Sequence, residues 1–185
     1  GVVAALGGDL ALAAQDLTLW QPPAGRGTVE TLCLDPINPD LSFDLIDDAF
    51  NANPTSLTAA LEVLAATTPT HGVGRIEKGR RIAVLGDMLE LGSDEIAVHA
   101  SIADDKHLQT LDVIHCSGPR MRHLWDKLPE GQRGHWFATA QEMAAQTAAI
   151  LDAGDVILVK GSKGSKVSLV VDAIRKLGHR SLPTN

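Results

Sequence analysis

Residues 81–92 read RIAVLGDMLELG, an apolar run that ends at Gly86 and leads into a loop. The run has the length of a strand, and its lack of polar alternation is typical of a strand covered on both faces. A helical pattern of apolar residues follows from Ser93 to about Leu108. This stretch therefore predicts a strand, a loop and a helix, in that order.

The same unit of strand, loop and helix recurs downstream. The predicted pairs are 112–116 with 119–128, 134–137 with 139–151, and 155–160 with 166–177. Upstream, two strands at 28–34 and 42–47 precede a helix that begins at an Asn53 N-cap with Pro54 in its first turn and runs to Ala66. This alternation favours a doubly wound α/β domain with a mostly parallel sheet, whose ligands bind beyond the carboxyl ends of the strands.

The composition is that of a globular protein, since 44% of the 185 residues are hydrophobic and 21% are charged. These values exclude a disordered, collagen-like or disulfide-scaffold chain. No uncharged apolar run reaches the roughly 18 residues of a membrane helix, and the net charge of −7 argues against nucleic acid or anionic lipid as a partner. Cys33 and Cys116 form no CxxC motif, so we expect no structural zinc, no disulfide and a reducing, cytoplasmic location.

A Pro/Gly cluster at residues 21–27 is the best candidate for a domain boundary. Before it, residues 2–19 carry apolar side chains at helical spacing, interrupted at Gly7 and Gly8. The chain starts with neither Met nor the basic and apolar regions of a signal peptide. We therefore expect that it begins partway through a larger protein.

Three loops that follow predicted strands carry chemically active groups, and the first spans residues 47–54. It gathers Asp47, Asp48, Asn51 and Asn53 where a strand ends and a helix begins. Carboxylates can accept hydrogen bonds from ribose hydroxyls or support a hydrated Mg²⁺, and carboxamides pair with polar edges of a base or peptide. The structural alternative is a solvated strand end at Asp47 and a simple N-cap at Asn53.

The second loop, residues 86–92, has a glycine at each end, which permits positive φ or a close backbone approach. Asp87 is a candidate ligand group. The apolar members Met88 and Leu91 are better explained as core residues that fold the loop over the sheet end. For His99, in the following helix, we expect a structural hydrogen bond.

The third loop, KGSKGSK at residues 160–166, lies directly between a predicted strand and a predicted helix. Backbone N–H groups freed by glycine, serine hydroxyls, lysine ammonium groups and a helix N-terminus are typical of a cradle for phosphate or carboxylate. It is not a Walker A motif, because the residue directly before Lys166 is not glycine, and no strand-to-helix turn carries GxGxxG. The alternative is a solvated lysine loop.

Five segments together resemble the carboxyl-terminal part of the Mur ligase family. They are LGGDLALAAQDL (6–17), PPAGRG (22–27), LIDDAFNANPTSLTAAL (45–61), GRRIAVLGDMLELG (79–92) and GDVILVKGSKGSK (154–166). They occur in family order, cover nearly the whole chain, and include the highly specific combination of NANPTS with GDMLELG. The resemblance implies a Rossmann-like carboxyl-terminal domain at 25–180, preceded by a tail of the central ATPase domain at 1–24 and followed by a short tail at 181–185.

The resemblance further implies an ATP-dependent amide ligase that adds D-Ala-D-Ala to UDP-MurNAc-tripeptide through an acyl phosphate, in cytoplasmic peptidoglycan precursor synthesis. In this family an amino-terminal domain holds the UDP-sugar and a central P-loop domain activates the peptide carboxylate. The P-loop, the Mg²⁺ ligands and the modified lysine of the central domain have no counterpart in these residues. The implied cofactors ATP and Mg²⁺ therefore require the two missing domains as partners, and we expect no metal ligand in this chain and no activity of the chain alone.

The resemblance also implies roles for five residues on the nucleotide side. Arg26, in GRG, is the implied catalytic residue, which contacts ATP phosphate and offsets charge as the acyl phosphate forms. Asp48 is implied to bind the ribose, Asn51 and Asn53 to line the nucleotide edge, and Phe50 to lie beside the base.

On the acceptor side, the implied ligands for the D-Ala-D-Ala carboxylate are Lys160, Ser162 and Lys163. The sequence departs from the family at two places. Ala49 and Phe50 stand where the family has Ser-Tyr, which removes a hydroxyl contact, and residues 164–167 replace an Arg/Met-containing continuation.

Two other function classes remain open at this point. The first is a stand-alone flavodoxin-like module that binds a phosphate or nucleotide without catalysis; the partial helix before Pro22 and the isolated Arg26 disfavour it. The second is a nucleotide-dependent enzyme complete in this chain, which the absence of a Walker A motif disfavours. A GxxGKT/S loop encoded upstream would decide for the ligase.

Overall fold

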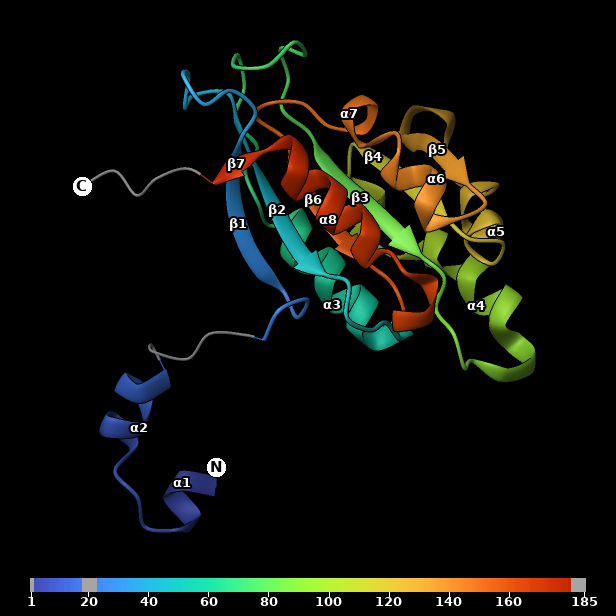
Figure 1. Ribbon diagram of the computed structural model, residues 1–185. Helices are drawn as coiled ribbons and strands as arrows, with labels where there is room; N and C mark the ends of the chain where they lie inside the picture. Colours follow the sequence, from blue (N-terminus) through green and yellow to red (C-terminus); the bar gives the residue numbers. More distant parts are fainter. Residues whose placement is uncertain (1, 18–22, 181–185) are drawn as a thin grey trace.

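The computed structural model describes residues 2–17 and 23–180, and within them one seven-stranded sheet has the order β5-β4-β3-β6-β2-β1-β7 (Figure 1). The strands are β1 Thr28–Cys33, β2 Ser42–Asp48, β3 Arg81–Gly86, β4 Val113–Ser117, β5 Arg133–Phe137, β6 Val156–Lys160 and β7 His179–Arg180. The five strands from β5 to β2 pair in parallel, whereas β1 is antiparallel to both β2 and β7. The prediction of a mostly parallel sheet is confirmed.

Helices cover both faces of this sheet because successive side chains of each central strand point to opposite sides. On β3, Ala83 and Leu85 belong to one hydrophobic cluster, and Ile82 and Val84 belong to the other. The first cluster packs under α3 Pro54–Ala65, α4 Glu95–Ser101 and α5 Met121–Trp125. The second packs under α6 Ala140–Ala144, α7 Thr147–Ile150 and α8 Ser168–Leu177. The doubly wound α/β architecture is therefore confirmed.

The start of α3 follows the predicted capping chemistry. Asn53 Oδ1 accepts a hydrogen bond from the Ser56 N–H at 2.9 Å, and Ser56 Oγ accepts one from the Asn53 N–H at 3.1 Å. Pro54 occupies the first turn, where its missing N–H has no cost. Such a capping box stabilises a helix start by about 1 kcal/mol, and here it fixes the end of the loop that follows β2.

Several helices are shorter than predicted because polar side chains compete for their backbone groups. The helix predicted at 93–108 is α4 followed by two 3₁₀ turns, and Asp105 Oδ1 accepts from the N–H groups of His107 and Leu108. The helix predicted at 139–151 is divided into α6 and α7, and the Thr147 hydroxyl donates to the Ala144 carbonyl at the break. The last helix, α8, starts at Ser168 because Lys166 has a left-handed φ of 59°.

The opening segment contains two short helices, α1 Val2–Ala5 and α2 Leu10–Leu17, which lie apart from the sheet in Figure 1. The predicted interruption is confirmed, since Gly7 has a φ of 72° and Asp9 accepts from the N–H groups of Ala11 and Leu12. Residues 18–22, in the predicted helix end and boundary, and the predicted tail at 181–185 lie outside the described residues. In the described part of the chain, no helix combines the length and the hydrophobicity needed to span a membrane.

Replacing His115 by glutamine should make stability less sensitive to acid. His115, on β4, is buried and accepts a hydrogen bond at Nδ1 from the His135 N–H. Burial, together with the charges of His135 and Arg80, lowers the pKa of His115 from 6.5 to about 3. The neutral ring therefore stabilises the fold fully above pH 6.5, and this stabilisation is lost as the pH falls toward 3, because the unfolded chain takes up the proton first.

Within that pH window, the wild type should lose up to about 1.4 kcal/mol of unfolding free energy per pH unit more than His115→Gln. Urea unfolding of both proteins between pH 7 and pH 4 measures the difference. Parallel pH profiles would show that His115 does not carry this acid sensitivity.

Candidate functional site

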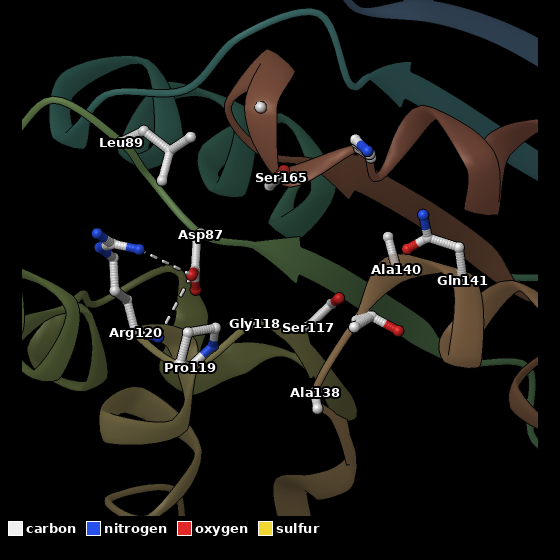
Figure 2. A pocket seen from close by; sticks show the side chains of 13 residues that line it. Asp87, Leu89, Ser117, Gly118, Pro119, Arg120, Ala138, Ala140, Gln141 and Ser165 are labelled. Atoms are coloured by element: carbon white, nitrogen blue, oxygen red, sulfur yellow. Dashed lines mark hydrogen bonds and ion pairs between the residues drawn. The ribbon is translucent and has the colours of Figure 1, made fainter.

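Three depressions lie at the carboxyl edge of the sheet, where the loops after β2, β3, β4 and β6 meet. The Asp48 cleft, of about 220 Å³, is lined by Gly25, Arg26, Asp48, Phe50, Asn51, Ala52, Asn53, Ser56 and Lys160. The Lys163 cavity, of about 430 Å³, is lined by residues 50–53, 89–91 and 162–164. The Arg120 cavity, of about 400 Å³, lies between residues 117–120, 138–141 and 164–166, beside Asp87 and Leu89 (Figure 2). Residues 50–53 line both the cleft and the Lys163 cavity, so the two spaces adjoin.

The Asp48 cleft is built around an ion pair between neighbouring strands, in which only the lysine is buried. In the parallel register of β2 and β6, Asp48 lies opposite Lys160. Lys160 Nζ donates to Asp48 Oδ2 at 2.6 Å and to the Asn51 carbonyl at 3.0 Å. Lys160 is only 2% exposed, whereas the Asp48 side chain is 21% exposed. The lysine is therefore part of the wall of the cleft, and the carboxylate faces the cleft itself.

Asp47, the other carboxylate of this strand end, is not a solvated group. Its Oδ1 accepts from the Ala49 N–H at 3.2 Å, and its Oδ2 accepts from Arg175 of α8 at 2.8 Å. Arg175 also pairs with Glu30 of β1. The structural alternative that left Asp47 in solvent is wrong, because consecutive residues of a strand point to opposite faces and Asp47 meets α8.

The segment before β1 brings Arg26 to the same cleft. Gly25, with a φ of 75°, accepts a hydrogen bond from the Phe50 N–H at 3.0 Å, and the Gly27 N–H donates to the Asp47 carbonyl at 2.8 Å. These bonds dock the segment on the loop after β2. The Arg26 guanidinium then lies 4.2 Å from the centre of the Phe50 ring, and both side chains are exposed. A cation and a carboxylate therefore face one cleft from different parts of the chain.

The two asparagines of this loop differ in how much of their polar surface is used. Asn53 caps α3 through its Oδ1 and also lines the cleft, so the capping and cleft-facing interpretations hold together. Asn51 is exposed; its main-chain carbonyl accepts from Lys160, and its side chain has no hydrogen-bond partner in the part of the chain that the structure describes.

Ser162, in the loop after β6, links the loop after β2 to the loop after β3. Its hydroxyl donates to the Ala52 carbonyl at 3.2 Å and accepts from the Leu89 N–H at 2.9 Å. The backbone approaches closely here, because a Cβ on Gly161 would lie 2.6 Å from Ser165 Oγ and 3.1 Å from Gly86 Cα. Of the three predicted acceptor ligands, Lys160 and Ser162 are buried in these contacts, and Lys163 is exposed at the Lys163 cavity.

The Arg120 cavity has a cation that the sequence interpretation missed. Arg120 Nε lies 2.6 Å from Glu95 Oε2, and its NH1 lies 3.6 Å from Asp87 Oδ2. Figure 2 shows the contacts between Asp87 and Arg120. Asp87 is buried and also accepts from the Met121 N–H at 2.8 Å, so its carboxylate mainly secures the start of α5. The exposed Lys166 lies at the same cavity. Arg120 lies in the loop after β4, just as Lys163 lies in the loop after β6. A basic residue directly after a predicted parallel strand is the signal by which the sequence could have identified Arg120.

The predictions for the loop after β3 are confirmed where they were structural. Met88 is fully buried. His99 Nε2 accepts from the Met88 N–H at 2.9 Å, so the proton is on Nδ1, which donates to the Glu95 carbonyl at 2.6 Å. The sequence predicts either a positive φ or a close approach for the glycines at the two ends of this loop. Gly92 has a φ of 73°, and Gly86 lies close to Val167.

Comparison with known proteins decides the family. The model of the family described as Mur ligase, glutamate ligase domain, matches residues 37–163, which include most of this site. The chain belongs to the Mur ligase family. The resemblance seen in the sequence segments is thereby confirmed.

Two relatives of this Mur ligase chain carry the same name. It is 26% identical over 171 residues to a UDP-N-acetylmuramoyl-tripeptide--D-alanyl-D-alanine ligase of Rickettsia prowazekii, a match that covers 92% of this chain and 34% of the relative. It is 36% identical over 151 residues to the protein of the same name from Mycobacterium bovis, covering 70% of this chain and 28% of the relative. The chain thus spans about a third of the length of these relatives.

Solved Mur ligase structures share the fold. A MurF ligase of Thermotoga maritima in complex with ADP matches with a TM-score of 0.72 at 22% identity, covering 95% of this chain and 36% of that one. A MurF of Acinetobacter baumannii matches with a TM-score of 0.68 at 25% identity, covering 94% and 35%. The architecture described above is therefore that of part of these ligases.

Proposed function

We propose that this chain is the carboxyl-terminal domain of an ATP-dependent ligase that adds D-Ala-D-Ala to UDP-MurNAc-tripeptide in peptidoglycan precursor synthesis. The names of the relatives support this assignment. The observation that carries it is the Asp48 cleft, in which Arg26 and Asp48 face one space from different segments of the chain. ATP as a substrate places the proposed reaction in the cytoplasm.

The cleft suits one end of a nucleotide. The Arg26 guanidinium is a donor for a phosphate oxygen, and its stacking on Phe50 holds it without neutralising its charge. The exposed side of the Asp48 carboxylate is an acceptor for ribose hydroxyls, while Phe50, Asn51 and Asn53 supply the ring and the amide groups beside it. Among residues 2–17 and 23–180, no cluster of three His, Cys, Asp or Glu side chains is suited to a metal ion. We assign the Mg²⁺ ligands to the central domain.

The acceptor side of the proposed reaction lies across residues 50–53 from the nucleotide side. D-Ala-D-Ala is a zwitterion, so its carboxylate needs a cation and its amine must reach the activated peptide carbonyl. Lys163 is the cation of the predicted set that is open to solvent, and Arg120 and Lys166 add charge at the adjoining cavity. Holding the amine beside the acyl phosphate replaces a bimolecular encounter by a fixed geometry, which is the main contribution expected of this domain.

The rest of the proposed enzyme is the amino-terminal UDP-sugar domain and the central P-loop domain. We assign residues 1–24 to the tail of that central domain, residues 25–180 to the domain described here and residues 181–185 to a carboxyl-terminal tail. Closure of this domain on the central one would bring Arg26 and Asp48 to the nucleotide and exclude water from the acyl phosphate.

The proposal is tested by exchanging Asp48 for alanine in the full-length ligase. Loss of charged hydrogen bonds to the ribose should raise the KM for ATP. The resulting fall in kcat/KM should correspond to about 1–3 kcal/mol of lost transition-state stabilisation. The ADP dissociation constant, measured by calorimetry, should rise in parallel.

The matched control is Asp44→Ala, which removes a carboxylate from the same strand but outside the cleft, where it accepts from Thr31. Its kinetics should remain those of the wild type. A wild-type ligase without ATP-dependent amide formation would contradict the proposed function, whereas normal kinetics of Asp48→Ala would contradict only the role of Asp48.

A further inference from the structure

Lys160 differs from the other lysines of its loop because its ammonium group is turned back into the domain. It is 2% exposed, whereas Lys163 and Lys166 are exposed. It lines the Asp48 cleft, not the Lys163 or Arg120 cavity. We propose that Lys160 is a positioning residue for the nucleotide side of the reaction, acting through Asp48 and Asn51. This inference rests on the proposed function and assigns Lys160 a role other than binding the acceptor carboxylate.

The first contact fixes the orientation of a carboxylate. Asp48 and Lys160 lie at the same level of two adjacent parallel strands, and Nζ donates to Asp48 Oδ2 at 2.6 Å. One carboxylate oxygen is thereby engaged. Among the described residues, the other oxygen has no hydrogen-bond partner, so it remains for a ligand in the cleft.

The second contact fixes the loop that carries the remaining cleft residues. Nζ also donates to the Asn51 carbonyl at 3.0 Å. This carbonyl lies between Phe50, on which Arg26 stacks, and the capped start of α3 at Asn53. The ammonium group of Lys160, at the end of β6, therefore holds the end of β2 and the loop after β2 in a fixed arrangement.

The burial of Lys160 makes this arrangement rigid. A buried ammonium must keep its hydrogen-bond acceptors, since an unpaired charge in the interior is strongly unfavourable. Asp48 and the Asn51 carbonyl are consequently held in place whether or not a ligand is bound. A preset carboxylate binds a ligand without the loss of side-chain entropy that a free one would undergo.

Positioning of the nucleotide side and binding of the acceptor carboxylate predict opposite effects of a Lys160 substitution on the two ligands, and a double-mutant cycle with Asp48 tests the first role. In the full-length ligase, Lys160→Met should raise the ADP dissociation constant and the KM for ATP at least tenfold. The KM for D-Ala-D-Ala should stay within about threefold. The part of the effect that passes through Asp48 should not add to that of Asp48→Asn, and only the contact with the Asn51 carbonyl remains to be lost. The variant Asp48→Asn/Lys160→Met should therefore bind ADP less than tenfold more weakly than Asp48→Asn alone.

Two matched lysine variants accompany the cycle. Lys176→Met removes an exposed lysine of α8. It should leave the ADP dissociation constant and the KM values for ATP and D-Ala-D-Ala unchanged. Lys163→Met removes the exposed lysine of the same loop and should leave ADP binding unchanged.

The inference is overturned if Lys160→Met raises the KM for D-Ala-D-Ala more than the ADP dissociation constant, or if its effect on ADP binding adds fully to that of Asp48→Asn. Should Lys160→Met fail to fold, the comparison of Asp48→Asn with the double variant still decides. In Asp48→Asn the amide oxygen and the Asn51 carbonyl remain as acceptors for Lys160, and the double variant contains no buried charge at this position. A tenfold difference in ADP binding between those two proteins would equally overturn the inference. A wild-type ligase that forms no amide would instead refute the proposed function.

Discussion

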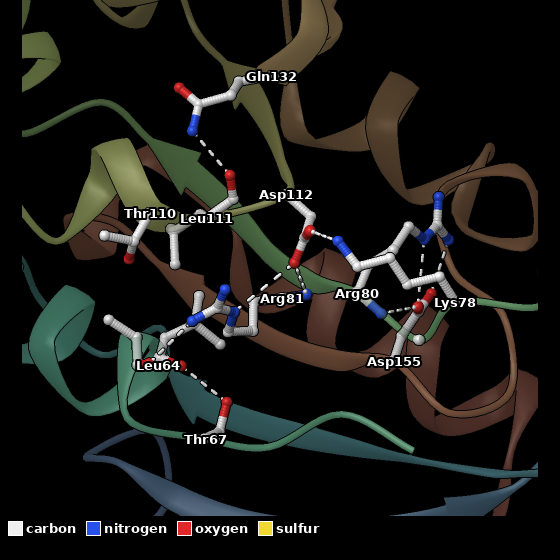
Figure 3. A network of polar contacts seen from close by, with 12 residues as sticks. Leu64, Thr67, Lys78, Arg80, Arg81, Thr110, Leu111, Asp112, Gln132 and Asp155 are labelled. Atoms are coloured by element: carbon white, nitrogen blue, oxygen red, sulfur yellow. Dashed lines mark hydrogen bonds and ion pairs between the residues drawn. The ribbon is translucent and has the colours of Figure 1, made fainter. Parts of the chain in front are cut away.

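Replacing Asp155 by alanine should lower the free energy of unfolding by about 3–5 kcal/mol, because it leaves a partly buried arginine and two main-chain N–H groups without their acceptor. Asp155 is 1% exposed and directly precedes β6. It accepts from Arg80 at the main-chain N (2.9 Å), at Nε (3.1 Å) and at NH2 (2.6 Å), and from the Asp152 N–H at 2.7 Å. Arg80 directly precedes β3, so this pair joins the amino ends of the two central strands (Figure 3).

Asp126→Ala is the matched control for this loss. Asp126 also pairs with an arginine, Arg122, at 2.9 Å, but both side chains are about half exposed, at 52% and 42%. Solvent screens such a pair, and its removal should cost less than about 1 kcal/mol. Denaturant unfolding of the three proteins measures the contrast. Equal midpoints for the two variants would contradict the structural role given to Asp155.

The largest kinetic effect is expected for Arg26. In the full-length ligase, Arg26→Ala should lower kcat about 100-fold or more, since it removes a preorganised cation from the charge that develops during phosphoryl transfer. Arg26→Lys keeps the charge but not the flat face that stacks on Phe50 at 4.2 Å, and we expect an intermediate rate. Steady-state rates of phosphate release at saturating substrates give the comparison.

Arg122→Ala controls for the loss of a stacked arginine. Arg122 lies over Trp125 at 4.5 Å, far along the chain from the Asp48 cleft, and is not among the residues that line it. Its kcat should match the wild type. A normal kcat for Arg26→Ala would remove Arg26 from the proposed catalytic set.

The fold could be predicted because its determinants are local in the sequence. Apolar runs such as residues 81–86 define buried strands, and the Asn53-Pro54 cap defines a helix start, both without reference to distant residues. Strand β7 escaped prediction because its two residues pair with β1 across most of the chain. The breaks at Asp105 and Thr147 escaped because a polar side chain within a helical pattern can point to solvent or to the backbone, and the sequence alone does not distinguish the two.

The candidate site was predictable as a set of loops but not as a set of contacts. All the predicted site residues except Arg26 lie at the carboxyl end of a parallel strand or in the loop that follows it, so the topology alone brings them to one edge. Lys160 and Lys163 look equivalent in KGSKGSK, yet a strand residue that neighbours Asp48 in the sheet is buried and a loop residue three positions later is not. Such a difference depends on strand order, which places β6 beside β2 and which periodicity does not encode.

The close approach of Gly86 and Gly161 divides the glycines of this edge into two kinds. A methyl group on Gly161 would meet Ser165 Oγ at 2.6 Å and Val167 Cγ2 at 2.8 Å, and one on Gly86 would collide with the same valine. A methyl group on Gly164 would meet only the tip of the Leu89 side chain, Cδ1 at 2.5 Å, which can rotate away. Gly161 and Gly86 thus let the ends of β6 and β3 lie in direct contact, and alanine at either position would force Val167, Ser165 or the backbone to shift, whereas alanine at Gly164 would displace only the Leu89 side chain.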